Sequence, residues 1–283
     1  MGASIYYFLK EKPKGELKIE ILDSRSRLVR TLSSVARVPD YSSEEDDPED
    51  FKKLALAIDP GVHRAEWDLA WEGSQKIKGG KIDTGDPTSG PRAVPGAYTV
   101  RLTVDGRTAT SPLLIVADPR GSLSPSDLDA QLAYSLRVRD DISKLTGLVN
   151  EVRSVREQLQ GRIKALEPRK SEAPVAELLK SSEAAIKRAD VLEDRLHNPT
   201  AEVVYDILAM RGGTRLYSRL SPLQMWAIEA DGPPTAGMTQ VIELQEQELA
   251  QLERETRAFF SQEVAPINAT AAKLGLAFVV IGR

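Results

Sequence analysis

Apolar and polar residues alternate along several short stretches in the first 117 residues of the chain. In ELKIEIL, the residues Leu17, Ile19 and Ile21 fall on one side of an extended chain, and charged residues fall on the other. This alternation is typical of a half-buried strand in an antiparallel sheet. It recurs at 63–69 and 98–104. Further strands are expected at 5–10, which is rich in aromatic and β-branched residues, and at 27–32 and 109–117, with turn residues such as Asp105-Gly106 between the stretches. The pattern predicts six or seven short strands.

From Ser124 onward, apolar residues recur every three or four positions, which is the period of an α-helix. Ser124, Pro125 and Asp127 form a helix start, with a capping serine, proline in the first helical position and an acid in the first turn. Four helices are expected. They cover 124–166, 175–196, a stretch from 199 through 226 that Gly212 and Gly213 interrupt, and 235–273. The short breaks favour antiparallel neighbours.

Together the two patterns predict a multidomain protein of the all-β plus all-α class. Residues 1–120 are expected to form an immunoglobulin-like β-sandwich, and residues 121–283 an antiparallel four-helix bundle with long helices. The apolar stripe does not distinguish a bundle within one chain from a coiled coil between two copies. The apolar C-terminal segment LGLAFVVIGR is expected either to fold back onto another element or to remain an exposed strand.

Composition narrows the possible chemistry. The chain has 283 residues with no cysteine and two histidines, which excludes disulfides and argues strongly against a zinc site. Its 42 acidic and 38 basic residues give no basic footprint for a nucleic-acid partner. No apolar run reaches the ~18 residues of a membrane span, and the first residues lack the pattern of a signal peptide. We therefore predict no catalytic, cofactor-binding or metal-ligating residue, no cofactor, no nucleic-acid partner and no membrane span.

Three side chains that could carry chemistry have structural interpretations. Trp67 lies on the same side of its strand as His63 and is expected to anchor a core. His63 itself is expected to be half-buried and hydrogen-bonded rather than a catalytic base. His197 precedes a helix cap and is expected to be exposed, which argues against a Ser-His-Asp triad.

Two loops are considered as ligand sites. The acidic run PDYSSEEDDPEDF at 39–51 is expected to be a solvated loop, because it lacks the spacing of a calcium-binding loop. The glycine-rich stretch 72–95 contains no phosphate-loop pattern, and no helix follows it to hold a phosphate at its N-terminus. Neither loop therefore predicts a ligand.

The order of these pieces resembles a known family. IYYFLK, LKIEILD and LVRTL are followed by the acidic loop, RAEWDL, GPRAVPGAYTVRLTVDG, PLLIVADPR, a long helix and ADGPPT. This order resembles the C-terminal region of large bacterial β-propeller proteins that carry BNR or sortilin-like repeats and are often labelled glycosyl hydrolases. Residues 2–120 are also similar to the immunoglobulin-like domain of the flagellar hook-capping protein. The resemblance implies an accessory module of an exported protein, periplasmic or extracellular, and it carries over no catalytic residue.

Two classes of function follow. We favour a non-catalytic accessory module that docks onto an upstream β-propeller or another protein, or that associates with itself through its helices. The alternative is part of a glycoside hydrolase, whose acid and base carboxylates stand ~5 to 9 Å apart. Glu66, Asp68 and Glu72 are the candidates for that chemistry, although Asp68 more simply ends a strand.

Overall fold

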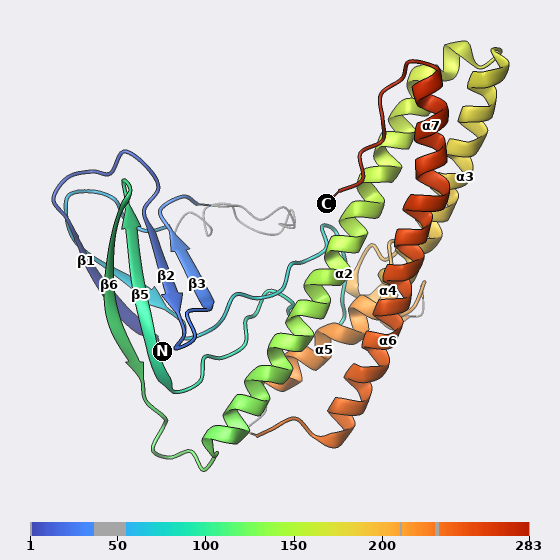
Figure 1. Cartoon of the computed structure of the whole chain (residues 1–283). Coiled ribbons are helices and arrows are strands. Elements are labelled where there is room, and N and C mark those ends of the chain that lie inside the picture. Colours follow the sequence, from blue (N-terminus) through green and yellow to red (C-terminus); the bar gives the residue numbers. More distant parts are fainter. Residues whose placement is uncertain (1, 37–54, 210, 230–231, 283) are drawn as a thin grey trace. The chain divides into compact units, whose positions relative to one another are not determined.

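The computed structural model describes residues 2–36, 55–209, 211–229 and 232–282 (Figure 1). The strands are β1 (Ala3–Leu9), β2 (Lys18–Leu22), β3 (Leu28–Ser33), β4 (Gly61–Trp67), β5 (Gly96–Val104) and β6 (Arg107–Ile115). The helices are α2 (Pro125–Leu166), α3 (Ala173–Leu196), α4 (Val204–Leu208), α5 (Leu216–Glu229), α6 (Ala236–Phe259) and α7 (Ala265–Lys273). A 3₁₀ turn at Glu167–Arg169 follows α2, and a π-helical turn at Phe260–Val264 joins α6 to α7.

The strands form two antiparallel sheets. One contains β1 and β4, and the other has the order β3-β2-β5-β6. In the larger sheet Ile19 lies opposite Leu102, and Ile21 lies opposite Val100. Ile19 and Ile21 are fully buried, whereas Glu20 between them is partly exposed, so the alternation predicted for this strand is confirmed.

Side chains from both sheets meet in one hydrophobic cluster. Trp67 is fully buried in it, and its indole Nε1–H donates a hydrogen bond to the carbonyl of Ala70 at 2.8 Å. The ring of Tyr98 stands edge-on to Trp67, with the ring centroids 5.6 Å apart. Trp67 therefore anchors this core, as predicted. The other buried members are Tyr7, Leu9, Leu17, Ile19, Ile21, Val29, Leu56, Ala65, Trp71, Val100 and Leu132.

The predicted fold class is wrong. The chain is not an all-β sandwich followed by an all-α four-helix bundle, but a mixed structure with about 48% helix, about 17% strand and two small sheets. Leu132 of α2 belongs to the cluster of the sheets, and Leu136 packs against that cluster. The physical reason is that a helical period shows that a stripe is buried, but not whether a sheet or another helix buries it.

The chain divides into two compact units that are interleaved in sequence. The first unit comprises residues 1–74, 86–139 and 224–235, and the second comprises residues 75–85, 140–223 and 236–283. Helical residues from α2 and α5 therefore share a unit with the strands. Independent folding of residues 1–120 and 121–283 stays a prediction.

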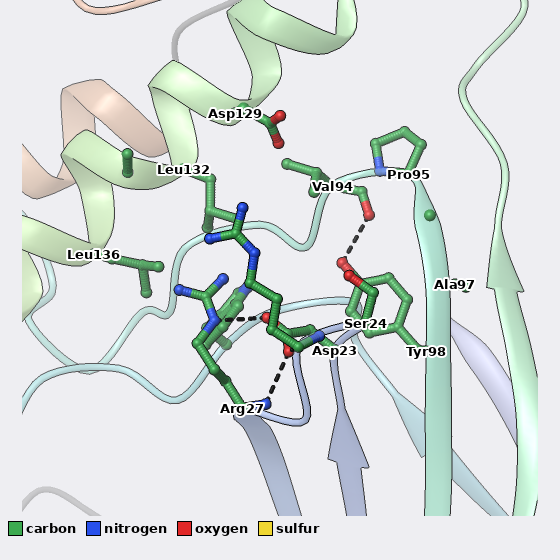
Figure 2. A pocket seen from close by; sticks show the side chains of 14 residues that line it. Asp23, Ser24, Arg27, Val94, Pro95, Ala97, Tyr98, Asp129, Leu132 and Leu136 are labelled. Carbon is green, nitrogen blue, oxygen red and sulfur yellow. Dashed lines mark hydrogen bonds and ion pairs between the residues drawn. The ribbon is translucent and has the colours of Figure 1, made fainter.

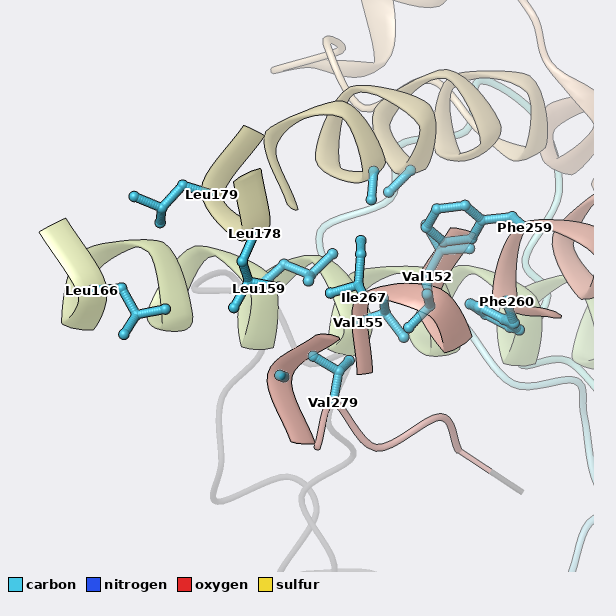
Figure 3. Close-up of a cluster of buried hydrophobic side chains, with 14 of the residues drawn as sticks. Val152, Val155, Leu159, Leu166, Leu178, Leu179, Phe259, Phe260, Ile267 and Val279 are labelled. Carbon is cyan, nitrogen blue, oxygen red and sulfur yellow. The ribbon is translucent and has the colours of Figure 1, made fainter. Parts of the chain in front are cut away.

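The second unit has its own hydrophobic cluster, drawn in Figure 3. Val152, Val155 and Leu159 of α2 are fully buried there and meet Leu178 of α3 and Phe259 of α6. Most positions of the apolar stripes predicted for these helices are buried or partly buried, whereas Val241, expected on the stripe of α6, is 40% exposed. Within the described ranges, no helix combines the length and the apolar character that crossing a membrane requires.

The helix boundaries follow local chemistry. Ser124 and Asp127 cap α2 reciprocally: the backbone N–H of Asp127 donates to Ser124 Oγ at 3.2 Å, and the backbone N–H of Ser124 donates to Asp127 Oδ2 at 3.1 Å. The expected interruption near Gly212 and Gly213 is present, and both glycines have positive φ, at 80° and 71°. The helix expected at 235–273 is present as one uninterrupted helical stretch, in which the π-helical turn is a local bulge between α6 and α7.

Two glycines allow a close approach of backbone segments in the loop after β4. The N–H of Trp71 donates to the carbonyl of Pro91 at 2.8 Å, so the two arms of the loop run side by side. A Cβ atom at Gly73 would lie 1.9 Å from Thr88 O, and one at Gly90 would lie 1.6 Å from Trp71 O. A side chain at either position would therefore separate the arms.

The tip of this loop is a structural part of the second unit. Ile77 is fully buried. The carbonyl of Gln75 accepts a hydrogen bond from Thr146 Oγ1 at 3.0 Å, and the carbonyl of Lys78 accepts one from Arg153 Nη1 at 2.7 Å. The glycine-rich sequence predicts a loop at 72–95, but it does not predict these contacts, because their partners are about 70 residues away in sequence.

We predict that Val29→Ala lowers the free energy of unfolding of the first unit by about 2 kcal/mol, because it opens a cavity at a fully buried position. The matched control Val62→Ala removes the same atoms from a side chain that is 71% exposed, and it should change stability by less than about 0.5 kcal/mol. Urea unfolding followed by tryptophan fluorescence measures both, since Trp67, Trp71 and Trp226 all belong to the first unit. Equal losses in the two variants would contradict this description of the core.

Candidate functional site

The best-formed candidate site is a pocket in the first unit with a volume of about 400 Å³ (Figure 2). This lies within the size range of small-ligand pockets. The turn that follows β2, the start of β5 with the residues before it, and the first turns of α2 form its walls. The lining residues are Asp23, Ser24, Arg25, Arg27, Trp71, Val94, Pro95, Gly96, Ala97, Tyr98, Asp129, Leu132, Ala133 and Leu136.

Asp23 organises the turn on one side of this pocket. Its Oδ1 accepts hydrogen bonds from the backbone N–H groups of Arg25, at 2.9 Å, and Arg27, at 2.8 Å. Its Oδ2 accepts a hydrogen bond from Arg27 Nε at 2.7 Å. Burial by itself would raise the pKa of Asp23, but these hydrogen bonds and the positive charge of Arg27 together lower it. Asp23 is thus a fixed anion that neutralises Arg27.

Trp71 is buried beside the turn, and two arginines face its ring. The guanidinium carbon of Arg27 lies 5.1 Å from the ring centroid, and that of Arg139 lies 6.0 Å from it. Both distances allow a cation–π attraction. Sequence reasoning did not assign Trp71, because Leu69 has a φ of 61° and interrupts the alternation that placed Trp67.

Tyr98 closes the pocket from β5. Its hydroxyl donates a hydrogen bond to the carbonyl of Val94 at 2.7 Å (Figure 2). Burial, together with the negative charge of Asp23, raises the pKa of Tyr98 to about 12. The hydroxyl therefore keeps its proton near neutral pH and is not a general base.

The lining combines charged groups with an apolar wall. Its titratable side chains are carboxylates, guanidinium groups and the one phenol described above, with no imidazole, thiol or amine among them. Arg25 and Asp129 make no ion pair with other described residues, so their charges are open to a ligand at the rim. A larger hollow of about 790 Å³ in the same unit shares Val94, Pro95 and Leu132 with this pocket.

The carboxylates considered for glycoside hydrolysis lie outside both hollows and face arginines. Glu66 pairs with Arg64 at 3.2 Å. Arg30 lies 3.7 Å from Asp68 and 3.5 Å from Glu72. All three carboxylates are exposed. The structure thus brings Asp68 and Glu72 to a shared arginine rather than to a sugar-sized cleft.

His63 is half-buried on β4, as predicted. Its Nε2 lies 2.5 Å from the carbonyl oxygen of Asp59, and its ring centroid lies 5.2 Å from that of Tyr7. These contacts fix the imidazole against the outer end of the strand pair. The acidic run 39–51, weighed above as a calcium loop, lies outside the described residues.

The prediction that His197 is exposed is wrong, because this side chain is only 1% exposed. Asn198 is also buried, and its Nδ2 donates to the carbonyls of Arg211 at 2.9 Å and Gly213 at 3.1 Å. The chain after α3 is therefore held over the end of that helix. No local pattern predicts this, because the two carbonyls that accept from Asn198 Nδ2 lie 13 and 15 residues away.

His197 belongs to a buried charge cluster centred on Glu193. Glu193 Oε1 accepts hydrogen bonds from Arg153 Nε at 2.7 Å and lies 2.9 Å from His197 Nε2, while Arg156 pairs with Oε2. Burial alone would raise the pKa of Glu193, but His197 and the two arginines lower it to about 2. Both Glu193 oxygens are engaged by protein groups, so the cluster stabilises the helices and offers no free base.

Neither metal-ligating side chains nor similar proteins point to a function for the described residues. In the described part of the chain, no group of three or more histidine or acidic side chains is arranged to hold a metal ion. No family model, curated protein or solved structure matches the chain.

We predict that Glu193→Gln lowers the free energy of unfolding of the second unit by about 3 kcal/mol at pH 7, because two partly buried arginines lose their buried counter-charge. The pKa of Glu193 is lowered on folding, so its contribution is present above about pH 4.5 and is lost as pH falls toward about 2. The difference in free energy of unfolding between wild type and Glu193→Gln should therefore shrink as pH falls from about 4.5 to about 2. Urea unfolding curves recorded by circular dichroism at each pH give the free energy of unfolding of both proteins.

Asp190→Asn is the matched control for this experiment. Asp190 also pairs with Arg156, at 3.1 Å, but its side chain is 55% exposed. An exposed pair contributes less than about 1 kcal/mol. A loss in Asp190→Asn as large as that in Glu193→Gln, or a Glu193→Gln gap that does not change between pH 4.5 and 2, would contradict the buried-cluster interpretation.

Proposed function

We propose that this chain is a non-catalytic accessory module of a larger exported bacterial β-propeller protein, and that it acts by docking onto the propeller. The observation that carries the proposal is the outer face of the β1–β4 sheet. Tyr6 and Phe8 of β1 are 69% and 66% exposed there, and Phe8 lies directly opposite the exposed Val62 of β4.

This face departs from the pattern of the other strands. A sheet with one face in water normally places polar residues on that face. β1 instead carries apolar residues on both sides, since Tyr7 and Leu9 are buried while Tyr6 and Phe8 point outward. Adjacent exposed apolar side chains are typical of a surface that another protein covers.

The remaining chemistry is consistent with a module that binds rather than catalyses. The pocket beside Trp71 offers the guanidinium of Arg25, the carboxylate of Asp129 and an apolar wall, while its second carboxylate, Asp23, is held by Arg27. The buried Glu193 is held by His197 and two arginines. The glycoside hydrolase alternative gains no support from Asp68 and Glu72, because both face Arg30 at the surface.

We expect Phe8→Ser to weaken binding to the upstream region at least ~10-fold, because it removes an aromatic anchor from the centre of the docking face. The measurement is isothermal titration of this chain with the polypeptide that the reading frame encodes directly upstream of Met1. Leu114→Ser is the matched control, since Leu114 of β6 is equally exposed at 69% but lies on the other sheet. Equal affinities of the two variants, or an upstream frame without propeller repeats, would contradict the proposal.

The purified chain should show no turnover of aryl glycosides above the buffer rate. A panel of nitrophenyl glycosides followed by absorbance tests this directly. The decisive contrary result is turnover that persists through purification and disappears in Asp68→Asn or Glu66→Gln. Such a result would replace the proposed module with an enzyme.

A further inference from the structure

The C-terminal segment after α7 lies extended along the helices of the second unit (Figure 1). Gly275 ends α7 with a φ of 66°, and the N–H of Leu276 donates to the carbonyl of Ala271 at 3.0 Å. This is a left-handed helix cap that turns the chain back. Of the two outcomes expected from the sequence, the segment therefore folds back.

Side-chain amides on two helices bind the main chain of this segment. Asn268 of α7 accepts a hydrogen bond from the N–H of Val279 at 2.8 Å and donates one to its carbonyl at 2.9 Å. Gln158 of α2 does the same for Val280, at 2.8 Å from the N–H and 2.9 Å to the carbonyl. Each amide thus replaces a neighbouring strand, because it supplies one donor and one acceptor to the same residue.

A third side chain of the helices binds the main chain of the segment closer to Gly275. Arg162 of α2 donates from Nη2 to the carbonyl of Ala277 at 2.6 Å. The binding surface formed by Gln158, Arg162 and Asn268 is called the amide groove below. These five hydrogen bonds reach only backbone atoms of the segment, so any requirement on its side chains comes from packing and not from the hydrogen bonds.

One side chain of the segment fixes its register. Val279 is 3% exposed and lies in the helical cluster near Val155 and Ile267 (Figure 3). Its neighbours Phe278 and Val280 point outward and are exposed. The amide groove therefore selects an extended peptide with a small apolar residue at one position.

We infer that the amide groove is a peptide-binding site, and that the C-terminal segment of a second copy of this chain can occupy it in place of the molecule's own. The second copy is the occupant because its segment is chemically identical and fits the groove by the same five hydrogen bonds. Only the turn at Gly275 connects the segment to α7, so a change at this turn redirects it without disturbing the helix. Exchange of an identical element is a common route to a dimer.

The test uses a fluorescein-labelled peptide with the sequence of residues 276–283 and the full chain. In wild type the tethered segment competes at an effective concentration on the order of 1 mM. Val279→Asp puts a charge at the buried position and releases the segment, so this variant should bind the peptide at least ~10-fold more tightly than wild type. Val280→Asp is the matched control, because that side chain is exposed, and it should behave like wild type.

Two further changes separate groove binding from non-specific adhesion. Adding Asn268→Ala to Val279→Asp should weaken peptide binding at least ~10-fold, because two hydrogen bonds are lost. A peptide methylated on the nitrogen of residue 280 should weaken similarly, since it cannot donate to Gln158. Circular dichroism establishes that each variant is folded, and Val279→Ser replaces Val279→Asp if the latter is not. Absence of peptide binding by the folded variant, or binding that Asn268→Ala does not affect, would overturn the inference.

Discussion

The apolar stripe of α2 must be shielded from water along 42 residues, and this requirement organises the rest of the structure. Near its start the stripe supplies Leu132 and Leu136 to the cluster of the two sheets. Further along it supplies Val152, Val155 and Leu159 to the helical cluster. Among the described elements, the next longest helices, α3 and α6, have 24 residues each, so neither covers the whole stripe. The helix therefore contributes to both compact units, and a boundary between an all-β and an all-α part does not describe the fold.

The buried charge of Glu193 is compensated by its neighbours. Glu193 is almost fully buried, and its pKa stays near 2 because Arg153, Arg156 and His197 surround it. A lone carboxylate in the same position would be driven toward its neutral form. The same principle holds in the pocket, where Asp23 is fixed by Arg27. These groups stabilise elements and position them, and the pairing leaves them little capacity for proton transfer.

Two extended segments, in contrast, expose apolar side chains at positions where a strand with one side in water normally carries polar residues. The outward side of β1 and the outward side of the C-terminal segment both carry aromatic or β-branched side chains. In each case the opposite side of the same stretch is buried in a core. The chain thus has extended segments with two apolar sides, one used internally and one available to another polypeptide.

The local pattern of the sequence determined the strands, most helix positions, the cap at Ser124 and Asp127, and the burial of Trp67. Each of these depends on neighbours within a few residues, so periodicity and capping chemistry are sufficient. Only the tertiary structure decided that His197 is buried, that the tip of the glycine-rich loop joins the helices, and that Trp71 lies between arginines beside a pocket. Those outcomes depend on pairs far apart in sequence, such as Asn198 with Gly213 or Lys78 with Arg153. The period of the hydrophobic residues shows which side of a helix or strand is buried. Which other element buries that side depends on packing between segments far apart in sequence.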